Sequence, residues 1–256
     1  MDSKGHLARQ EAVQFDLDTQ SPLRVHPSKV VLVDPHCFGL EELPEASEKR
    51  ARVAKVILTQ NHIFADPPIS NTDDLPSDDH DLEDTNSPLF IHLAHNLAYT
   101  TGSALGSTPP SLDTCLAAYL VPNSAGLTAG SRAWSKHSHR SQPSPSDGAE
   151  TDKRKRSTGW WGITSGPVSV INEKSLALFR KVTDNATWRN LHWLPHQVLV
   201  YEVRVPEGYG MRWSQDQGDR GGDVAKGDRS WIFRGFLEPT MTNGHELKWR
   251  HPIVST

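Results

Sequence analysis

Hydrophobic and polar residues alternate most clearly between positions 198 and 205. The odd-numbered positions from 199 to 205 are all apolar, whereas Glu202 and Arg204 stand between them. Side chains of a strand point to opposite faces of a sheet in turn, so this pattern predicts an antiparallel strand with one core-facing side.

The stretch from Tyr201 to His251 extends this pattern and organises the rest of the chain. It predicts a strand, a tight turn at Gly208 and Gly210, a second strand through Trp213, a polar loop, a third strand that Arg234 and Glu238 flank, and a polar tail. Glycine suits the positive φ angles of a hairpin or a bulge. Upstream, residues 168–171 are typical of a short strand, and 176–182 of a helix that residues 172–175 introduce.

The N-terminal half gives weaker patterns. Residues 30–33 are a β-branched run that predicts a buried strand, and Ser47 can cap a following helix with an apolar stripe. Apolar spacing predicts a second helix over 89–105, and residues 112–121 fit either a third helix or a strand.

A helix followed by several strands with turn glycines predicts an α+β fold: a C-terminal antiparallel sheet with one or more packed helices and long polar insertions. We expect 1–28 to be a flexible arm and 29–124 a mixed helix and strand region with an acidic loop at 66–88. We expect 125–158 to be a disordered linker and 159–256 a Trp-rich α+β unit, packed with 29–124 as one domain. Seven of the eight tryptophans lie between Trp160 and Trp249.

Composition narrows the class of protein. The hydrophobic content of 36% and the eighteen prolines indicate polar linkers that dilute an ordinary domain. The formal net charge of −4 argues against nucleic acid as a partner. Cys37 and Cys115 lack C-x-x-C spacing and are expected to be reduced thiols. Without a signal sequence or an apolar run of membrane-spanning length, we expect a soluble intracellular protein, cytoplasmic rather than nuclear. The basic residues Lys153–Arg156 fit a nuclear signal or a solvated loop.

Standard catalytic signatures are missing from the sequence. It contains no phosphate-binding G-x-x-x-x-G-K-[ST], no full G-x-G-x-x-G, no G-x-S-x-G and no H-E-x-x-H. These absences disfavour ATPases, dinucleotide-binding dehydrogenases, α/β-hydrolases and zincin proteases. No motif implies a cofactor.

Histidine pairs and an acidic run are the candidates for metal binding. His92 and His95 are spaced for one helical face, but a lone pair needs further ligands, so a packing or capping role is favoured. Pro195 interrupts the spacing of His192 and His196. His137 and His139 lie in the expected linker, and the acidic loop lacks the EF-hand pattern. We therefore predict no metal site.

The C-terminal cluster is the better candidate for a functional site. If its strands are neighbours, a carboxylate, a histidine and arginines converge on one face, and this set can transfer protons and hold an anion. The candidate catalytic residues are Glu202, Arg212, Glu238 and His245, and the candidate ligand-binding residues are Arg204, Tyr209, Trp213, Arg234 and His251. The alternative is that these charges pair across strands on a solvated face and that the tryptophans only pack.

The same region resembles a family of uncharacterised proteins from fungi and plants. The resemblance rests on Gly-Tyr-Gly-Met-Arg-Trp at 208–213, Phe-Arg-Gly-Phe-Leu-Glu-Pro at 233–239, Gly-His at 244–245 and Trp-Arg-His at 249–251. It covers about the last sixty residues. It implies a fungal or plant origin and a shared C-terminal site, and no established activity comes with it.

Three functions fit these observations. The first is a small-molecule enzyme or pocket protein that takes a polar or anionic ligand at the C-terminal cluster. The second is a non-catalytic interaction protein. The third is a metal-independent ribonuclease or RNA-binding module, because a helix followed by an antiparallel sheet with Glu, Arg and His is the general arrangement of several small ribonucleases. Whether the protein is an enzyme, and its oligomeric state, stay open.

Overall fold

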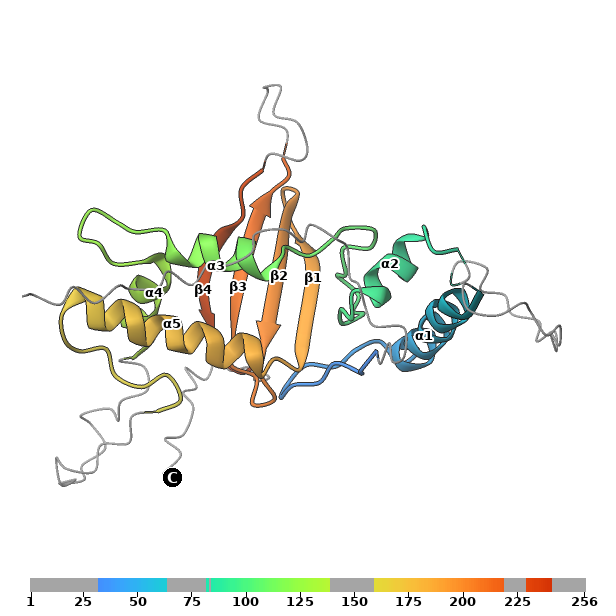
Figure 1. Ribbon diagram of the computed structural model, residues 1–256, viewed down its shortest axis with the longest axis horizontal. Coiled ribbons are helices and arrows are strands. Elements are labelled where there is room, and N and C mark those ends of the chain that lie inside the picture. The colour runs from blue at the N-terminus through green and yellow to red at the C-terminus, as the bar shows by residue number, and fades with distance from the viewer. Residues whose placement is uncertain (1–31, 64–81, 83, 139–158, 219–228, 241–256) are drawn as a thin grey trace, which may run out of the picture.

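The computed structural model describes residues 32–63, 82, 84–138, 159–218 and 229–240 (Figure 1). Four strands form one antiparallel sheet in chain order: β1 (Trp188–Leu194), β2 (Val198–Arg204), β3 (Gly210–Asp216) and β4 (Ile232–Leu237). The predicted α+β class with a C-terminal antiparallel sheet is confirmed. Three of the four strands match the sequence prediction, and β1 was not predicted.

Three helices lie on one face of the sheet: α3 (Leu112–Leu120), α4 (Ala129–Ser138) and α5 (Val168–Asp184) (Figure 1). The apolar positions of β2 face them, as the alternation predicted. Leu199, Tyr201 and Val203 are all at most 8% exposed and belong to the main hydrophobic core. The indole of Trp213 donates to the Cys115 carbonyl at 3.0 Å and so ties β3 to α3.

The other two helices, α1 (Ala46–Ile63) and α2 (Pro88–Ala94), lie beyond the β1 edge of the sheet (Figure 1). They form a separate apolar cluster around Val53, Phe90 and Leu93. Arg50 on α1 is 1% exposed and forms ion pairs with Asp34 and Glu42. The Glu42 carboxylate also accepts from the Tyr99 amide at 2.8 Å, which anchors α1 to the segment that leads to the sheet.

That segment, residues 98–104, covers the free edge of β1. Backbone bonds run from Ala98 to Arg189 (2.7 Å), from Ala104 to Leu191 (2.8 Å) and from Trp193 to Gly102 (3.1 Å). An uncovered strand edge would present unpaired amides and carbonyls to other chains. The segment therefore completes the sheet on the side where His192 lies.

A tyrosine joins the three helices of the covered face. The Tyr119 hydroxyl donates to the Ser175 carbonyl at 2.7 Å, which links α3 to α5. Its ring lies so close to Gly130 of α4 that a methyl group at Gly130 would come within 1.9 Å of a ring carbon. Only glycine leaves room for this contact.

The sequence prediction was wrong at the start of α5. Residues 168–171 are helical, and α5 begins at Val168 after Pro167. Ile171, Ser175, Leu178 and Val182 share the spacing of one helical face and pack against the core. A four-residue apolar run cannot by itself separate a strand from a helix, and here its continuation as a helical stripe decides.

Three other expectations differ from the structure. The predicted helix over 89–105 ends at Ala94, because Asn96 adopts a φ of 54° and turns the chain away. The expected linker over 125–158 contains α4, whose Trp134 is 3% exposed. Leu32 and Val33, the described end of the predicted strand at 30–33, are in no strand.

Several expectations lie outside the described residues. These are the flexible arm at 1–28, most of the acidic loop at 66–88, and the basic run Lys153–Arg156. Within the described part of the chain, every helix is too short or too polar to cross a lipid bilayer.

The Gly130→Ala variant is expected to be less stable than the wild type. The added methyl group overlaps the Tyr119 ring, and overpacking of a dense core costs about 1–3 kcal/mol. This cost exceeds the gain of roughly 1 kcal/mol that alanine brings to a helix interior. Urea unfolding followed by circular dichroism measures the difference.

Gly102→Ala is the matched control, because the nearest atom to its added methyl group lies 4.0 Å away. Its free energy of unfolding should stay within about 0.5 kcal/mol of the wild type. Equal stability of the two variants would contradict the packing described for Tyr119.

Candidate functional site

A row of polar residues crosses the face of the sheet opposite the three helices. Asn190 of β1 is paired with Glu202 of β2, and Glu202 is paired with Arg212 of β3. Directly opposed residues of neighbouring strands have their Cβ atoms only about 5 Å apart. The register therefore brings these side chains together without any contribution from loops.

Glu202 holds an arginine on either side. Its Oε1 lies 3.2 Å from Nη2 of Arg204, and its Oε2 lies 3.6 Å from Nη2 of Arg212. The Glu202 residue is 7% exposed and Arg204 is 5% exposed, whereas the Arg212 side chain is 37% exposed. The charges do pair, as the alternative held, but Glu202 and Arg204 are buried rather than solvated, and Arg212 is the exposed member of the cluster.

Arg204 also fixes the backbone around the site. One of its Nη atoms donates to the Gly208 carbonyl at 2.7 Å and to the Glu238 carbonyl at 3.0 Å. Gly208 has a φ of 87°, and a side chain there would meet Phe38 and Pro239. One guanidinium thus joins β2, the β2–β3 turn and the end of β4.

His192 of β1 was not among the predicted site residues. It is paired with Val200, which puts it diagonal to Glu202 on the same face, at a Cβ separation of about 7 Å. Burial lowers the pKa of His192; Glu202 raises it, and Arg212 and Arg204 lower it further. The partly exposed ring is therefore neutral at pH 7 and can accept a proton.

Four buried polar atoms on this face have no hydrogen-bond partner among the described residues: Asn190 Oδ1, His192 Nδ1, Arg204 Nε and Arg212 Nε. An unsatisfied buried donor or acceptor costs about 1–3 kcal/mol. Folded proteins keep few such groups, and functional sites are among the places that retain them. Together with the two guanidinium groups, they define a candidate site for an anionic group with its own donors.

Two predicted ligand-binding residues lie on the other face of the sheet, so that part of the prediction was wrong. Trp213 is 0% exposed within the core beneath the helices. Tyr209 stacks on Trp160 with ring centroids 4.5 Å apart, and burial raises its pKa to about 12. Neither aromatic ring joins Glu202, because alternation along β3 puts Arg212 and Trp213 on opposite faces.

Glu238 lies just beyond β4, separate from the Glu202 carboxylate. Its Oε1 is 3.0 Å from both His137 Nδ1 and Trp161 Nε1. His137, which we expected in a solvated linker, belongs to α4 and is half-buried against this carboxylate. Glu238 reaches the site only through its backbone carbonyl, which Arg204 binds.

The remaining predicted residues do not join the cluster as described. Arg234 is exposed at a bulge in β4, where it has no partner on β3. His245 and His251 lie outside the described residues, and their predicted roles stay predictions.

The other histidines agree with the packing and capping interpretation. His92 is 0% exposed and its Nε2 donates to the Ala98 carbonyl at 3.0 Å, while His95 ends α2. Burial lowers the pKa of both. His196 lies exposed in the β1–β2 turn with a φ of 64°. Among the described residues, no three His, Cys, Asp or Glu side chains cluster as metal ligands would.

One family of known proteins matches part of the chain. The model of the CdiA C-terminal tRNase toxin domain matches residues 149–221, less than a third of the sequence. The described part of this match spans α5, β1, β2 and β3, and so contains His192, Glu202, Arg204 and Arg212. No curated protein and no solved structure matches the chain significantly.

This match contradicts the expectation that nucleic acid is not a partner. The expectation rested on the net charge of −4, which averages the whole sequence. Binding of a phosphate depends instead on local positive charge, and two arginines meet on the sheet face. The acidic residues at 66–88 contribute negative charge to the total, so the net charge does not reveal this arginine pair.

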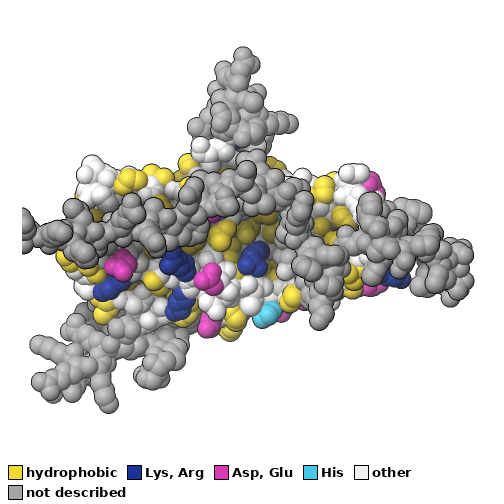
Figure 2. All heavy atoms as spheres, in the orientation of Figure 1, with side chains coloured by type: hydrophobic (Ala, Val, Ile, Leu, Met, Phe, Trp, Pro, Cys, Tyr) yellow, Lys and Arg dark blue, Asp and Glu magenta, His cyan; other side chains and the backbone are white. Residues whose placement is uncertain are grey.

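The helix side of the molecule does not show a single-sign surface. Figure 2 shows Lys and Arg side chains next to Asp and Glu side chains, among apolar ones, over the atoms that are coloured there. Interspersed charges of this kind are typical of a solvated surface. The arginine pair on the opposite sheet face is therefore the better candidate for an anion site.

The His192→Gln variant should lose less stability in acid than the wild type. The pKa of His192 is lowered below its ordinary value of about 6.5, so the native state binds fewer protons than the unfolded state just below that pH. The stability that the neutral His192 ring contributes is complete above about pH 6.5. It is lost as the pH falls from there through the lowered pKa of the native state. The wild type should therefore lose more stability than His192→Gln as the pH falls through this window.

Urea unfolding at intervals between pH 7.5 and 5 measures this dependence. His196→Gln changes an exposed histidine a few residues away and should follow the wild type. Parallel curves for wild type and His192→Gln would show that His192 is not buried as described.

Proposed function

We propose that this protein is a ribonuclease that cleaves RNA by acid–base chemistry without a metal ion. One observation carries the proposal: a carboxylate, two guanidinium groups and a neutral imidazole share one sheet face, within the segment that matches a tRNase toxin domain. The proposal takes up the ribonuclease alternative raised by the sequence.

The arginines are suited to hold a phosphodiester. Guanidinium groups bind phosphate oxygens in bidentate fashion and keep their charge at any physiological pH. Arg212 is the exposed member and meets the substrate first, while Arg204 lies deeper. The Nε atoms of both residues have no partner among the described residues but are buried, so the exposed part of the Arg212 guanidinium is the donor that a phosphate can reach. Their positive charges also stabilise the charge that develops on phosphorus.

His192 is suited to start the reaction. Because its pKa is lowered, the neutral ring can remove the proton from a ribose 2′-hydroxyl. The 2′-oxygen then attacks phosphorus, the bond from phosphorus to the 5′-oxygen breaks, and that oxygen takes a proton from water. The products are a 2′,3′-cyclic phosphate and a 5′-hydroxyl, so no metal or cofactor is consumed.

Glu202 has a positioning role in this scheme. Both of its oxygens face guanidinium groups, which leaves His192 as the better proton acceptor. Removing the carboxylate would leave two arginines repelling one another in a largely buried place. Glu202 therefore keeps the two cations close enough to bind one phosphate.

The two other functions raised by the sequence have less support. A cavity of about 550 Å³ in the described part of the chain is lined by none of Glu202, Arg204 and Arg212, so it gives no support to a small-molecule site at the cluster. The ion pairs of Glu202 with both arginines also fit a non-catalytic interaction surface, but the four buried atoms without a partner among the described residues favour a ligand site.

Purified wild-type protein is expected to cleave tRNA or single-stranded RNA, and His192→Ala should reduce kcat/KM by about 100- to 10,000-fold. Arg212→Ala should cost about 100-fold, mainly through loss of transition-state charge stabilisation. Gel analysis of end-labelled RNA measures both. His196→Ala and Arg180→Ala, on exposed residues, are the matched controls and should cleave at the wild-type rate.

The chemistry can be tested separately from the residues. Cleavage should persist in EDTA, should leave a 2′,3′-cyclic phosphate, and should fail at a position where the 2′-hydroxyl is replaced by hydrogen. The rate should fall as the pH decreases through the lowered pKa of His192, since the protonated ring cannot act as a base. Loss of cleavage in EDTA, or cleavage of the 2′-deoxy substrate, would sink the mechanism.

A further inference from the structure

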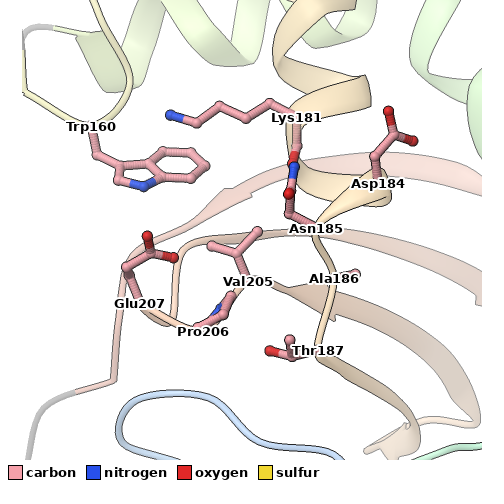
Figure 3. Close-up of a pocket in the computed structure, with 9 residues that line it drawn as sticks. All are labelled: Trp160, Lys181, Asp184, Asn185, Ala186, Thr187, Val205, Pro206 and Glu207. Atoms are coloured by element: carbon pink, nitrogen blue, oxygen red, sulfur yellow. The ribbon is translucent and has the colours of Figure 1, made fainter.

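A cavity of about 550 Å³ lies where α5 ends, the β2–β3 turn begins and Trp160 packs (Figure 3). Ligand sites of proteins commonly have volumes of roughly 300–1,000 Å³. Figure 3 shows Trp160 and Glu207 at one end of the cavity and Asp184 at the other, with Val205 and Pro206 between them. The cavity thus combines an aromatic wall, an apolar floor and a polar rim.

The aromatic wall is the stack of Tyr209 on Trp160, and the Lys181 side chain lies over the remaining face of Trp160. Tyr209 lies against one face of Trp160, with ring centroids 4.5 Å apart and an interplanar angle of 11°. The ammonium of Lys181 lies over the Trp160 ring, 3.8 Å from its centroid, and so takes the other face. Tyr209 is buried, whereas Lys181 is exposed on a flexible side chain.

The relative strengths of the two interactions favour replacement of the Lys181 ammonium by a nucleobase on the Trp160 ring. An exposed cation–π contact is weaker than the stacking of a nucleobase on an aromatic side chain. A base that slides between Lys181 and Trp160 continues the stack that Tyr209 begins.

The rim selects the kind of base. It has the two carboxylates of Glu207 and Asp184 against the single ammonium of Lys181, a balance that repels phosphate and attracts N–H donors. Guanine is the RNA base whose Watson–Crick edge offers two adjacent N–H donors, which match the two oxygens of one carboxylate. Glu207 lies at the same end of the cavity as Trp160 and supplies such a carboxylate (Figure 3).

The cavity and the arginine cluster are close along the chain. Val205, Pro206 and Glu207 follow Arg204 directly, and consecutive Cα atoms are about 3.8 Å apart, so the Cα atoms of Arg204 and Glu207 are separated by at most about 11 Å. The cavity lies on the helix side of the sheet and the arginine cluster on the opposite face, so a strand of RNA reaches both by passing around this end of the sheet.

We propose that this cavity binds a guanine base of the RNA, stacked on Trp160 and held at its edge by Glu207. The proposal rests on the ribonuclease function above and makes it selective: cleavage takes place near guanines in single-stranded segments, where the base is free to leave its own stack.

Binding of free nucleosides tests the site directly, because they lack the phosphate that the arginines bind. Calorimetry with the full-length protein should show guanosine binding more tightly than adenosine, cytidine or uridine. Glu207→Gln should weaken guanosine at least tenfold, whereas Glu173→Gln, which changes an exposed carboxylate on α5, should not. Lys181→Ala removes the competing ammonium and should tighten guanosine about two- to fivefold.

The outcomes separate this proposal from the proposed function. If RNA is cleaved in a His192-dependent manner but guanosine does not bind, the base site is wrong and the ribonuclease stands. If guanosine binds in a Glu207-dependent manner and no RNA is cleaved, the site stands and the ribonuclease is wrong. Equal binding of all four nucleosides, or guanosine binding that Glu207→Gln leaves unchanged, overturns the guanine assignment.

Discussion

The carboxylate that Glu202 shares between two arginines is the interaction around which the sheet face opposite the helices is arranged. Two arginines approach it from either side, and their like charges would repel one another without it. Because the Glu202 carboxylate and Arg204 are largely buried, water does little to screen either the attraction or the repulsion. The strand register that pairs Glu202 with Arg212 therefore also places the carboxylate where it offsets the repulsion between Arg204 and Arg212.

Arg204 extends this interaction to the ends of the strands. The guanidinium that meets Glu202 also binds the carbonyls of Gly208 and Glu238, so the turn after β2 and the end of β4 are held by the same group. Tertiary packing on the other face, through Tyr119 and Trp213, keeps the sheet rigid. The helices bury one face of the sheet and so stabilise the fold. This stability offsets the cost of the buried polar atoms that have no partner on the other face among the described residues.

Candidate site residues could be predicted from the sequence only where strand alternation was visible. Glu202 and Arg204 alternate with apolar residues in β2, so their common face was clear, and Arg212 follows by the hairpin geometry. His192 was missed because β1 reads Trp-Arg-Asn-Leu-His-Trp-Leu, in which apolar residues occur on both faces. Spacing along the chain suggested a pair with His196 instead. A strand pairing of β1 with β2 was the missing signal, since it places His192 diagonal to Glu202.

The sequence by itself determined the α+β class, the strands β2 to β4 and the glycine turn between the first two of them, because these depend on alternation and local backbone preferences. Tertiary structure alone decided which residues share a face, which arginine is buried, and where α5 begins. It also decided that Trp213 faces the core although it stands next to Arg212, and that Trp160, Lys181 and Glu207 line one cavity. Periodicity acts between neighbours in the chain, whereas register, burial and the orientation of a ring depend on partners far away in the sequence.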